Sequence, residues 1–194
     1  KVSPHKFGIS ITTIDGQRYN IGDTSDDFCI QSCCKIINYC LALEKHGVKK
    51  VHEHVGREPS GSEFNALFLD KRKRPHNPCI NAGAIMICSL INKNKETSDR
   101  FEFITNMWDK LSGNGKIKFN NSIYLSEKNS ADRNFALAYF MNENKAFPEN
   151  TNLLDILEFY FQCCSLELNS SSLSVVASTL ANGGICPITC EKIF

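Results

Sequence analysis

The sequence lacks several features that would assign it to a broad class of protein at once. Its formal net charge is only +1, so no excess of either sign draws it toward nucleic acid or toward an anionic membrane surface. No apolar run approaches the roughly 18 residues that a membrane-spanning helix needs. Residues 1–10 show neither the apolar core of a signal peptide nor the Arg-rich pattern of a transit peptide. We therefore expect no nucleic-acid partner and no membrane partner.

Zinc-binding spacings are absent too, although the chain holds 10 cysteines. There is no C-x-x-C, and Cys186 and Cys190 have no clustered histidines near them. The adjacent pairs Cys33–Cys34 and Cys163–Cys164 fall within helical patterns. Cys40 and Cys88 occupy apolar positions, where free cysteine behaves as a small hydrophobe. We expect buried free thiols in a reducing compartment, not a disulfide framework, and no metal site.

What is present is a β pattern at the start and helical patterns after it. FGISITT (7–13) and QRYNI (17–21) flank Asp15-Gly16, which predicts a hairpin. One hairpin is not a stable sheet, so we expect either helices that cover it or further strands outside this chain. We favour the second alternative and interpret the chain as a piece of a longer one. After Ser32 the patterns predict helices only, which are expected over 33–46 with an end at Gly47, over 81–91, from Thr97 or Ser98 to Gly113, over 131–144, after a cap at Thr151, and from about Ser171 to Asn182.

Ser32 and Lys35 stand at the start of the first helical pattern. Residues three apart on a helix share a face, with Cβ atoms about 5–6 Å apart. A neutral lysine there takes the serine proton if burial lowers its pKa from about 10.4. The same spacing occurs at Ser3 and Lys6 without a helix, so the spacing alone leaves a catalytic pair and two ordinary helix residues as alternatives. The S-D-N and K-T-G motifs of serine β-lactamases and transpeptidases are absent, so nothing supports a penicillin-recognising enzyme.

Seven longer strings decide between these alternatives. In order along the chain they are DGQRYNIGDTSDDFCIQSCCK, VGREPSG, FNALFLD, PHNPCINAGAI, SADRNFALAYFMNENKAFPE, EFYFQCCSLE and ASTLANGGICPITCEK. Together they resemble the serine-dependent glutaminase family, and most closely the animal kidney and liver types. The resemblance runs from residue 1 to about residue 192.

The resemblance implies an α/β (α+β) architecture with the β-lactamase/transpeptidase-like glutaminase fold. A mostly helical domain then accompanies an N-terminal β-hairpin, and the remaining strands of the sheet lie past the C-terminal end of this chain. Residues 1–194 are accordingly interpreted as part of a glutaminase catalytic domain, with residues 1–27 as the N-terminal strands of the sheet and residues 28–190 as the helical domain.

The activity that the resemblance implies is hydrolysis of L-glutamine to L-glutamate and ammonia, with Ser32 as nucleophile and Lys35 as proton acceptor. The substrate-binding positions that match the family are Ser32, Asn81, Glu127, Asn134 and Tyr160, and Gln31 lines the same pocket. Glu127 is the natural partner for the substrate ammonium. From the residues alone, other readings stay open: Asn81 as a helix cap, Glu127 as a solvated loop charge, Asn134 as a helix-surface amide and Tyr160 as a core aromatic.

The loop 60–78 resembles the segment that these enzymes place between dimers, so we expect a homo-oligomer, either a dimer or a tetramer. Its apolar residues Phe64, Leu67, Phe68 and Leu69 suit a contact surface, and packing into the chain's own core is the alternative. Ala66 stands where the animal enzymes carry lysine, so we expect regulation through this loop to differ here. The basic run 71–74 is read as a solvated stretch and not as a nucleic-acid patch.

No cofactor is implied, and phosphate is the expected activator. The animal-type resemblance suggests a mitochondrial location, with a cytoplasmic one as the alternative. Two relay tyrosines of the family are expected before Lys1 and beyond Phe194, so we expect this chain by itself to be inactive. The alternative function is a non-catalytic module that retains the oligomer contacts.

Overall fold

The computed structural model describes residues 3–194, which divide into two compact units. Unit 1 holds the residues up to Ile30 together with Glu102–Asn120 and Leu166–Phe194, and unit 2 holds Gln31–Phe101 and Asn121–Ser165. The predicted helical domain, 28–190, is thus shared between the two units, and its assignment as a domain stays a prediction. No helix in the described part of the chain is long and apolar enough to cross a membrane.

Unit 1 begins with the predicted hairpin. Strands β1 (Gly8–Thr12) and β2 (Arg18–Gly22) pair antiparallel, with Ile9 opposite Ile21. The turn between them closes through a 3.0 Å hydrogen bond from the Gly16 N–H to the Thr13 carbonyl. Gly16 has a φ of 87°, which glycine adopts without the strain that a Cβ would bring. The hairpin prediction is confirmed.

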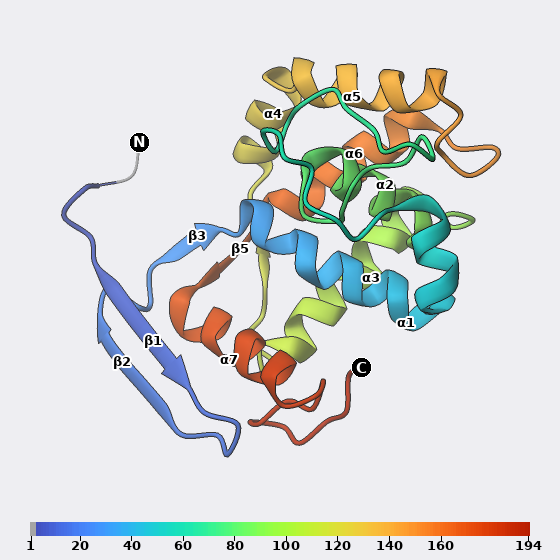
Figure 1. The fold of residues 1–194 in the computed structure, drawn as a ribbon. Helices are drawn as coiled ribbons and strands as arrows, with labels where there is room; N and C mark the ends of the chain where they lie inside the picture. The colour runs from blue at the N-terminus through green and yellow to red at the C-terminus, as the bar shows by residue number, and fades with distance from the viewer. Residues whose placement is uncertain (1–2) are drawn as a thin grey trace. The chain divides into compact units, whose positions relative to one another are not determined.

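Helix α7 (Ser170–Ala181) covers β1 within unit 1, as Figure 1 shows. Hydroxyl pairs join the two elements: Ser10 to Ser170 at 3.0 Å and Thr12 to Ser174 at 2.7 Å. The apolar side chains of the hairpin stay exposed, namely Ile9, Ile11, Tyr19 and Ile21. A helix therefore does cover the hairpin on one side, but it leaves an apolar row of side chains without cover from the described residues.

A second, antiparallel sheet in unit 1 has the strand order β3-β5-β4, with β3 at Asp27–Cys29, β4 at Lys118–Phe119 and β5 at Leu166–Asn169. The prediction of helices only after Ser32 is therefore wrong for β4 and β5. These strands are two and four residues long, too short to show an alternating pattern. Their pairing partners are distant in the sequence, so local residue patterns could not reveal them.

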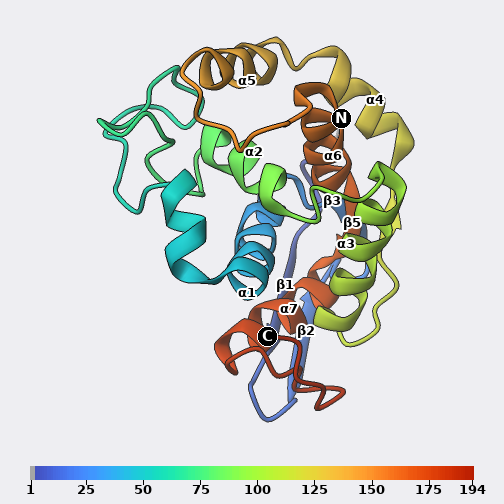
Figure 2. The ribbon, with the colours of Figure 1, turned by 90° about the vertical axis from the view of Figure 1, so that its right-hand side faces the viewer.

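Unit 2 is built on helix α2 (Asn81–Leu90), whose residues from Ala82 to Leu90 are all buried. It packs against α1 (Cys34–His54), α5 (Asp132–Glu143) and α6 (Leu153–Cys164), and α4 (Asn121–Asn129) packs on α6 (Figure 2). Helix α3 (Thr97–Leu111) begins in unit 2 and continues into unit 1. The central, fully buried helix is thus confirmed.

Three details of the helices differ from expectation. The chain bends at Gly47 (φ 74°) but α1 resumes and continues to His54. Asn152, not Thr151, caps α6: its side-chain oxygen accepts from the Leu154 and Asp155 N–H groups, whereas the Thr151 hydroxyl donates to the Pro148 carbonyl. Helix α4 was not predicted, because its residues are mostly polar and none is fully buried.

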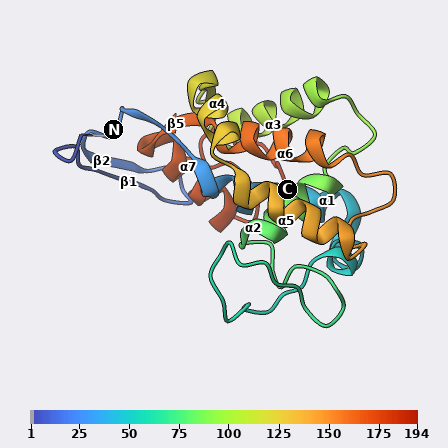
Figure 3. The same ribbon diagram turned by 90° about the horizontal axis from the view of Figure 1, so that it is seen from above.

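Between α1 and α2 the chain runs as a long loop without helix or strand, which includes the loop 60–78 expected from the sequence (Figure 3). All 10 cysteines are free. Five of them are buried, namely Cys34, Cys88, Cys163, Cys164 and Cys186.

Candidate active site

Ser32 lies in a single 3-10 turn, Gln31–Cys33, that leads directly into α1. The turn is entered through Gln31, whose φ of 46° lies in the left-handed region that non-glycine residues rarely occupy. Ser32 is exposed, whereas Lys35 in the first turn of α1 is only 6% exposed. The start of α1 therefore combines an exposed hydroxyl with a buried amine three residues later.

Lys35 is held by a side chain from another helix. Its Nζ donates a 2.8 Å hydrogen bond to Asn81 Oδ1. Burial lowers the pKa of Lys35, and the nearby thiols of Cys34 and Cys164 act weakly in the opposite sense. A lowered pKa is what a lysine needs in order to act as a base near neutral pH. No hydrogen bond joins Lys35 to Ser32 in residues 3–194 of the structure, where the Lys35 amine bonds Asn81. Contacts between a catalytic base and its nucleophile often tighten only when substrate binds.

Asn81 is the first residue of α2, and its carboxamide connects two partners. Besides accepting from Lys35, it donates through Nδ2 to Asn134 Oδ1 at 3.0 Å. The cap position of α2 belongs to Ile80, and no side chain caps this helix end. The alternative reading of Asn81 as a helix cap is therefore wrong. Asn134, in α5, is half-buried and bonded to Asn81, so it is not merely a solvated surface amide.

Glu127 belongs to α4 and not to a loop. It is half-buried, and its Oε1 accepts a 3.2 Å hydrogen bond from Gln31 Nε2. A carboxylate 96 positions away in the sequence thus contacts the residue that precedes Ser32. The reading of Glu127 as a solvated loop charge does not hold for the described structure.

Tyr160 comes from α6 and is 4% exposed. Its burial, aided by the thiols of Cys164 and Cys34, raises the pKa of the phenol. The hydroxyl therefore stays protonated and able to donate a hydrogen bond. The Cys34 and Cys164 sulfurs lie 3.8 Å apart, which places the N-terminal turn of α1 against α6.

Two bonded groups thus come together in unit 2 from separate helices. One joins Lys35, Asn81 and Asn134, and the other joins Gln31 and Glu127. Tyr160 shares the thiol neighbours Cys34 and Cys164 with Lys35. An exposed hydroxyl, a buried amine of lowered pKa, amides and a carboxylate form a set suited to acyl transfer on a small charged substrate.

A protein-family model described as glutaminase matches residues 1–194. The chain belongs to the glutaminase family. A relative from Caenorhabditis elegans is 51% identical over 190 residues, and the alignment covers 97% of this chain and 31% of the relative. The mitochondrial liver isoform of glutaminase from Rattus norvegicus is 44% identical over 193 residues, covering 100% of this chain and 32% of the rat protein.

Solved structures agree with this glutaminase assignment. A Bacillus glutaminase superposes with a TM-score of 0.89 at 30% identity, over 97% of this chain and 63% of that one. A second structure, that of Mglu in its native form, gives 0.91 at 31% identity over 100% of this chain and 46% of the other. The β-lactamase-like glutaminase fold is confirmed. The chain spans about a third of the length of the animal glutaminases it matches.

Proposed function

We propose that the full-length protein carrying this chain hydrolyses L-glutamine to L-glutamate and ammonia. The observation that carries the proposal is Lys35: a buried lysine of lowered pKa, three residues after an exposed serine and bonded to Asn81, in a chain of the glutaminase family. Mglu, one of the structural neighbours, has been solved in a glutamate form. That finding concerns Mglu, and it supports the same substrate class here.

The chemistry uses the side chains in two steps. Neutral Lys35 takes the proton of the Ser32 hydroxyl as Oγ attacks the side-chain amide carbon of glutamine. The C–N bond breaks, the proton passes to the leaving nitrogen, and ammonia departs from a glutamyl ester on Ser32. Water then attacks the ester and gives a proton to the same lysine. The ester C–O bond breaks, and Lys35 returns that proton to Ser32 Oγ as glutamate is released. No oxidation or reduction is involved, so the steps need no further reactant.

The remaining side chains hold the amino-acid end of the substrate. Glu127 is assigned to the substrate ammonium, because Gln31 engages only its Oε1 atom. Asn81 and Asn134 supply amide donors and acceptors, and Tyr160 supplies a protonated hydroxyl. Holding both charged groups fixes the side-chain amide over Ser32, which is worth several powers of ten in rate when the geometry is correct.

The direct test is an assay of the full-length protein with L-glutamine, with and without phosphate as the proposed activator. Glutamate and ammonia are expected in equal amounts. D-Glutamine serves as the control, because Glu127 and the amides would meet its ammonium in the wrong position. Absence of glutamate release under both conditions would overturn the proposal.

Replacing Glu127 with glutamine is expected to raise KM for L-glutamine by about tenfold to a hundredfold, because a charged hydrogen bond of about 1.5–3 kcal/mol is lost. The acceptor for Gln31 is kept, so kcat is expected to fall much less. The matched control is Glu158→Gln on α6, whose carboxylate pairs with Lys128 at 2.5 Å. An unchanged KM in Glu127→Gln would refute the ammonium assignment.

We also propose that the protein is a homo-oligomer, a dimer or tetramer, with the loop 60–78 at an interface. Within this loop Phe64 is 63% exposed, Phe68 49% and Leu67 43%. These side chains do not pack into the chain's own core, so the alternative reading of the loop is wrong for them. A run of exposed apolar residues in one loop is typical of a contact surface.

The double variant Phe64→Ser/Leu67→Ser is expected to lower the mass of the protein in solution by at least half, as measured by sedimentation. The change removes apolar contact area while leaving the Phe64 carbonyl, which accepts from the Asn81 N–H at 2.9 Å. Leu154→Ser, at an exposed position of α6, is the control and should not change the mass. A double variant with the wild-type mass would contradict the interface.

The rat and mouse relatives carry mitochondrial names, and we propose a mitochondrial location on that basis, with a cytoplasmic one as the alternative. Import can be tested by fractionating cells that express the full-length protein. Recovery in the cytosolic fraction alone would favour the alternative.

A further inference from the structure

Asn77, near the end of the loop before α2, is not among the candidate catalytic or substrate-binding residues, yet its side chain makes several hydrogen bonds. Its Oδ1 accepts from the backbone N–H groups of Cys79 at 2.9 Å and of Ile80 at 3.2 Å. An asparagine that bonds its own backbone in this way fixes the direction of a turn. The turn ends at Asn81, the residue that holds Lys35.

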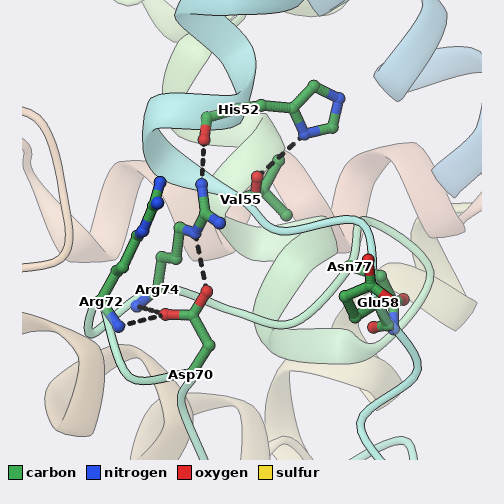
Figure 4. A network of polar contacts seen from close by, with 7 residues as sticks. All are labelled: His52, Val55, Glu58, Asp70, Arg72, Arg74 and Asn77. Carbon is green, nitrogen blue, oxygen red and sulfur yellow. Dashed lines mark hydrogen bonds and ion pairs between the residues drawn. The ribbon is translucent and has the colours of Figure 1, made fainter.

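The other end of the same carboxamide is also used. Asn77 Nδ2 donates to the Glu58 carbonyl at 3.1 Å, and Figure 4 shows the two residues together. Two backbone bonds continue this contact: the Gly56 N–H donates to the Pro75 carbonyl at 2.7 Å, and the Glu58 N–H to the His76 carbonyl at 3.0 Å. The two ends of the loop are therefore clamped together, and Asn77 closes the clamp on the side of α2.

The backbone of Asn77 is also packed against α2 itself. A Cβ added at Gly83, in the first turn of α2, would lie 1.9 Å from the Asn77 carbonyl oxygen. Such closeness is possible only because residue 83 is glycine. A shift of the Asn77 backbone would therefore also move the first turn of α2, which it contacts.

We propose that Asn77 is a positioning residue of the active site, acting through Asn81 on Lys35. This inference rests on the proposed glutaminase function. The bond from Lys35 to Asn81 is 2.8 Å long, so a displacement of the α2 start by about 1 Å would break it, and displacements of that size cost roughly a hundredfold in rate. The Asn77 carboxamide is the side chain that sets this start.

The experiment compares Asn77→Ala with Asn77→Asp in the full-length protein. In Asn77→Ala we expect kcat/KM to fall by about tenfold to a hundredfold. We also expect the acidic limb of its pH profile to move to lower pH, because Lys35 loses a carbonyl acceptor that favours its charged form. Asn77→Asp keeps acceptors for the Cys79 and Ile80 N–H groups but loses the donor to the Glu58 carbonyl, while the two backbone bonds of the clamp remain. Its kcat/KM should therefore stay closer to that of the wild type than the kcat/KM of Asn77→Ala does.

Asp70→Asn is the control for a loop that is weakened without touching Asn81. The Asp70 carboxylate accepts from the backbone N–H groups of Arg72 at 2.8 Å and of Arg74 at 3.1 Å. It also pairs with the side-chain Nε of Arg74 at 2.7 Å, and the Arg74 guanidinium in turn donates to the His52 carbonyl (Figure 4). This variant should lower Tm and leave the acidic limb in place.

If Asn77→Ala keeps the wild-type kcat/KM and an unmoved acidic limb of the pH profile while Ser32→Ala is inactive, the positioning role of Asn77 is overturned. The proposed glutaminase function is not affected by that result. An active Ser32→Ala would overturn the proposed function instead. If Asn77→Ala does not fold, Asn77→Asp and Asn77→Ser carry the test. The aspartate is expected to be the more active, and equal activity would refute the turn as the basis of positioning.

Discussion

Replacing Ser32 with alanine is expected to lower the kcat of the full-length protein by at least about 10⁴-fold, because loss of a catalytic nucleophile removes the covalent path altogether. Ser32 is exposed, and its side chain makes no hydrogen bond within residues 3–194. The substitution should therefore change the free energy of unfolding by no more than about 0.5 kcal/mol. Loss of activity without loss of stability is the pattern of a functional residue.

The chain provides a matched control for this variant in Ser3, which also precedes a lysine by three positions. Lys6 is exposed, and pairing with Asp26 raises its pKa, the opposite of the shift at Lys35. Ser3→Ala is expected to keep full activity. The measurement is glutamate release at saturating L-glutamine, and more than one per cent of wild-type turnover in Ser32→Ala would show that another group attacks the substrate.

Local patterns in the sequence predict the elements whose signals are contained in a short stretch of the chain. Asp15-Gly16 gives the hairpin, and the apolar run after Asn81 gives the central helix, because each signal lies within a few neighbouring residues. The same reasoning misses β5, which is four residues long and pairs with Asp27–Cys29 far away in the chain. It also ends α1 at Gly47, where a single glycine bends the chain and the helix then resumes.

Local sequence patterns predict even less of the candidate site than of the fold. Spacing places Lys35 one turn after Ser32, and that part follows from helix geometry alone. The contacts of Lys35 with Asn81 and of Gln31 with Glu127 join residues 46 and 96 positions apart. Those residues were identified by resemblance to a family, because no local rule connects an amide in the first turn of one helix with a lysine in another. The Asn-Pro pair at 77–78 is a turn signal, yet the signal does not reveal that the turn ends at the residue that bonds Lys35.

The second large effect is expected at Lys35. Two substitutions there distinguish the role of the proton that Lys35 gains and loses from the role of its positive charge. Lys35→Met removes both, and kcat/KM is expected to fall roughly a thousandfold or more. Lys35→Arg keeps the charge and the donors but cannot lose a proton at any working pH. If Lys35 is the base, arginine should be almost as inactive as methionine. An arginine variant with a tenth or more of wild-type activity would show that only the charge matters.

The pH dependence gives an independent measurement on the same residue. The base must be unprotonated, so kcat/KM should rise with pH and level off at a pH below the ordinary lysine pKa of 10.5. Lys6→Met is the control and should leave this limb unmoved. A limb centred at the ordinary lysine pKa would contradict a buried, largely neutral Lys35.

The free energy of unfolding should depend on pH through the same lowered pKa of Lys35. Burial lowers the pKa of Lys35 in the folded state, so between that lowered value and the ordinary one the unfolded chain binds more protons than the folded one. The free energy of unfolding of the wild type should therefore rise with pH across this window, relative to Lys35→Met, which carries no titrating group there. Urea unfolding at several pH values measures the difference. A difference that stays constant over the window would mean that Lys35 keeps its proton on folding, and a lysine that keeps its proton cannot take one from Ser32.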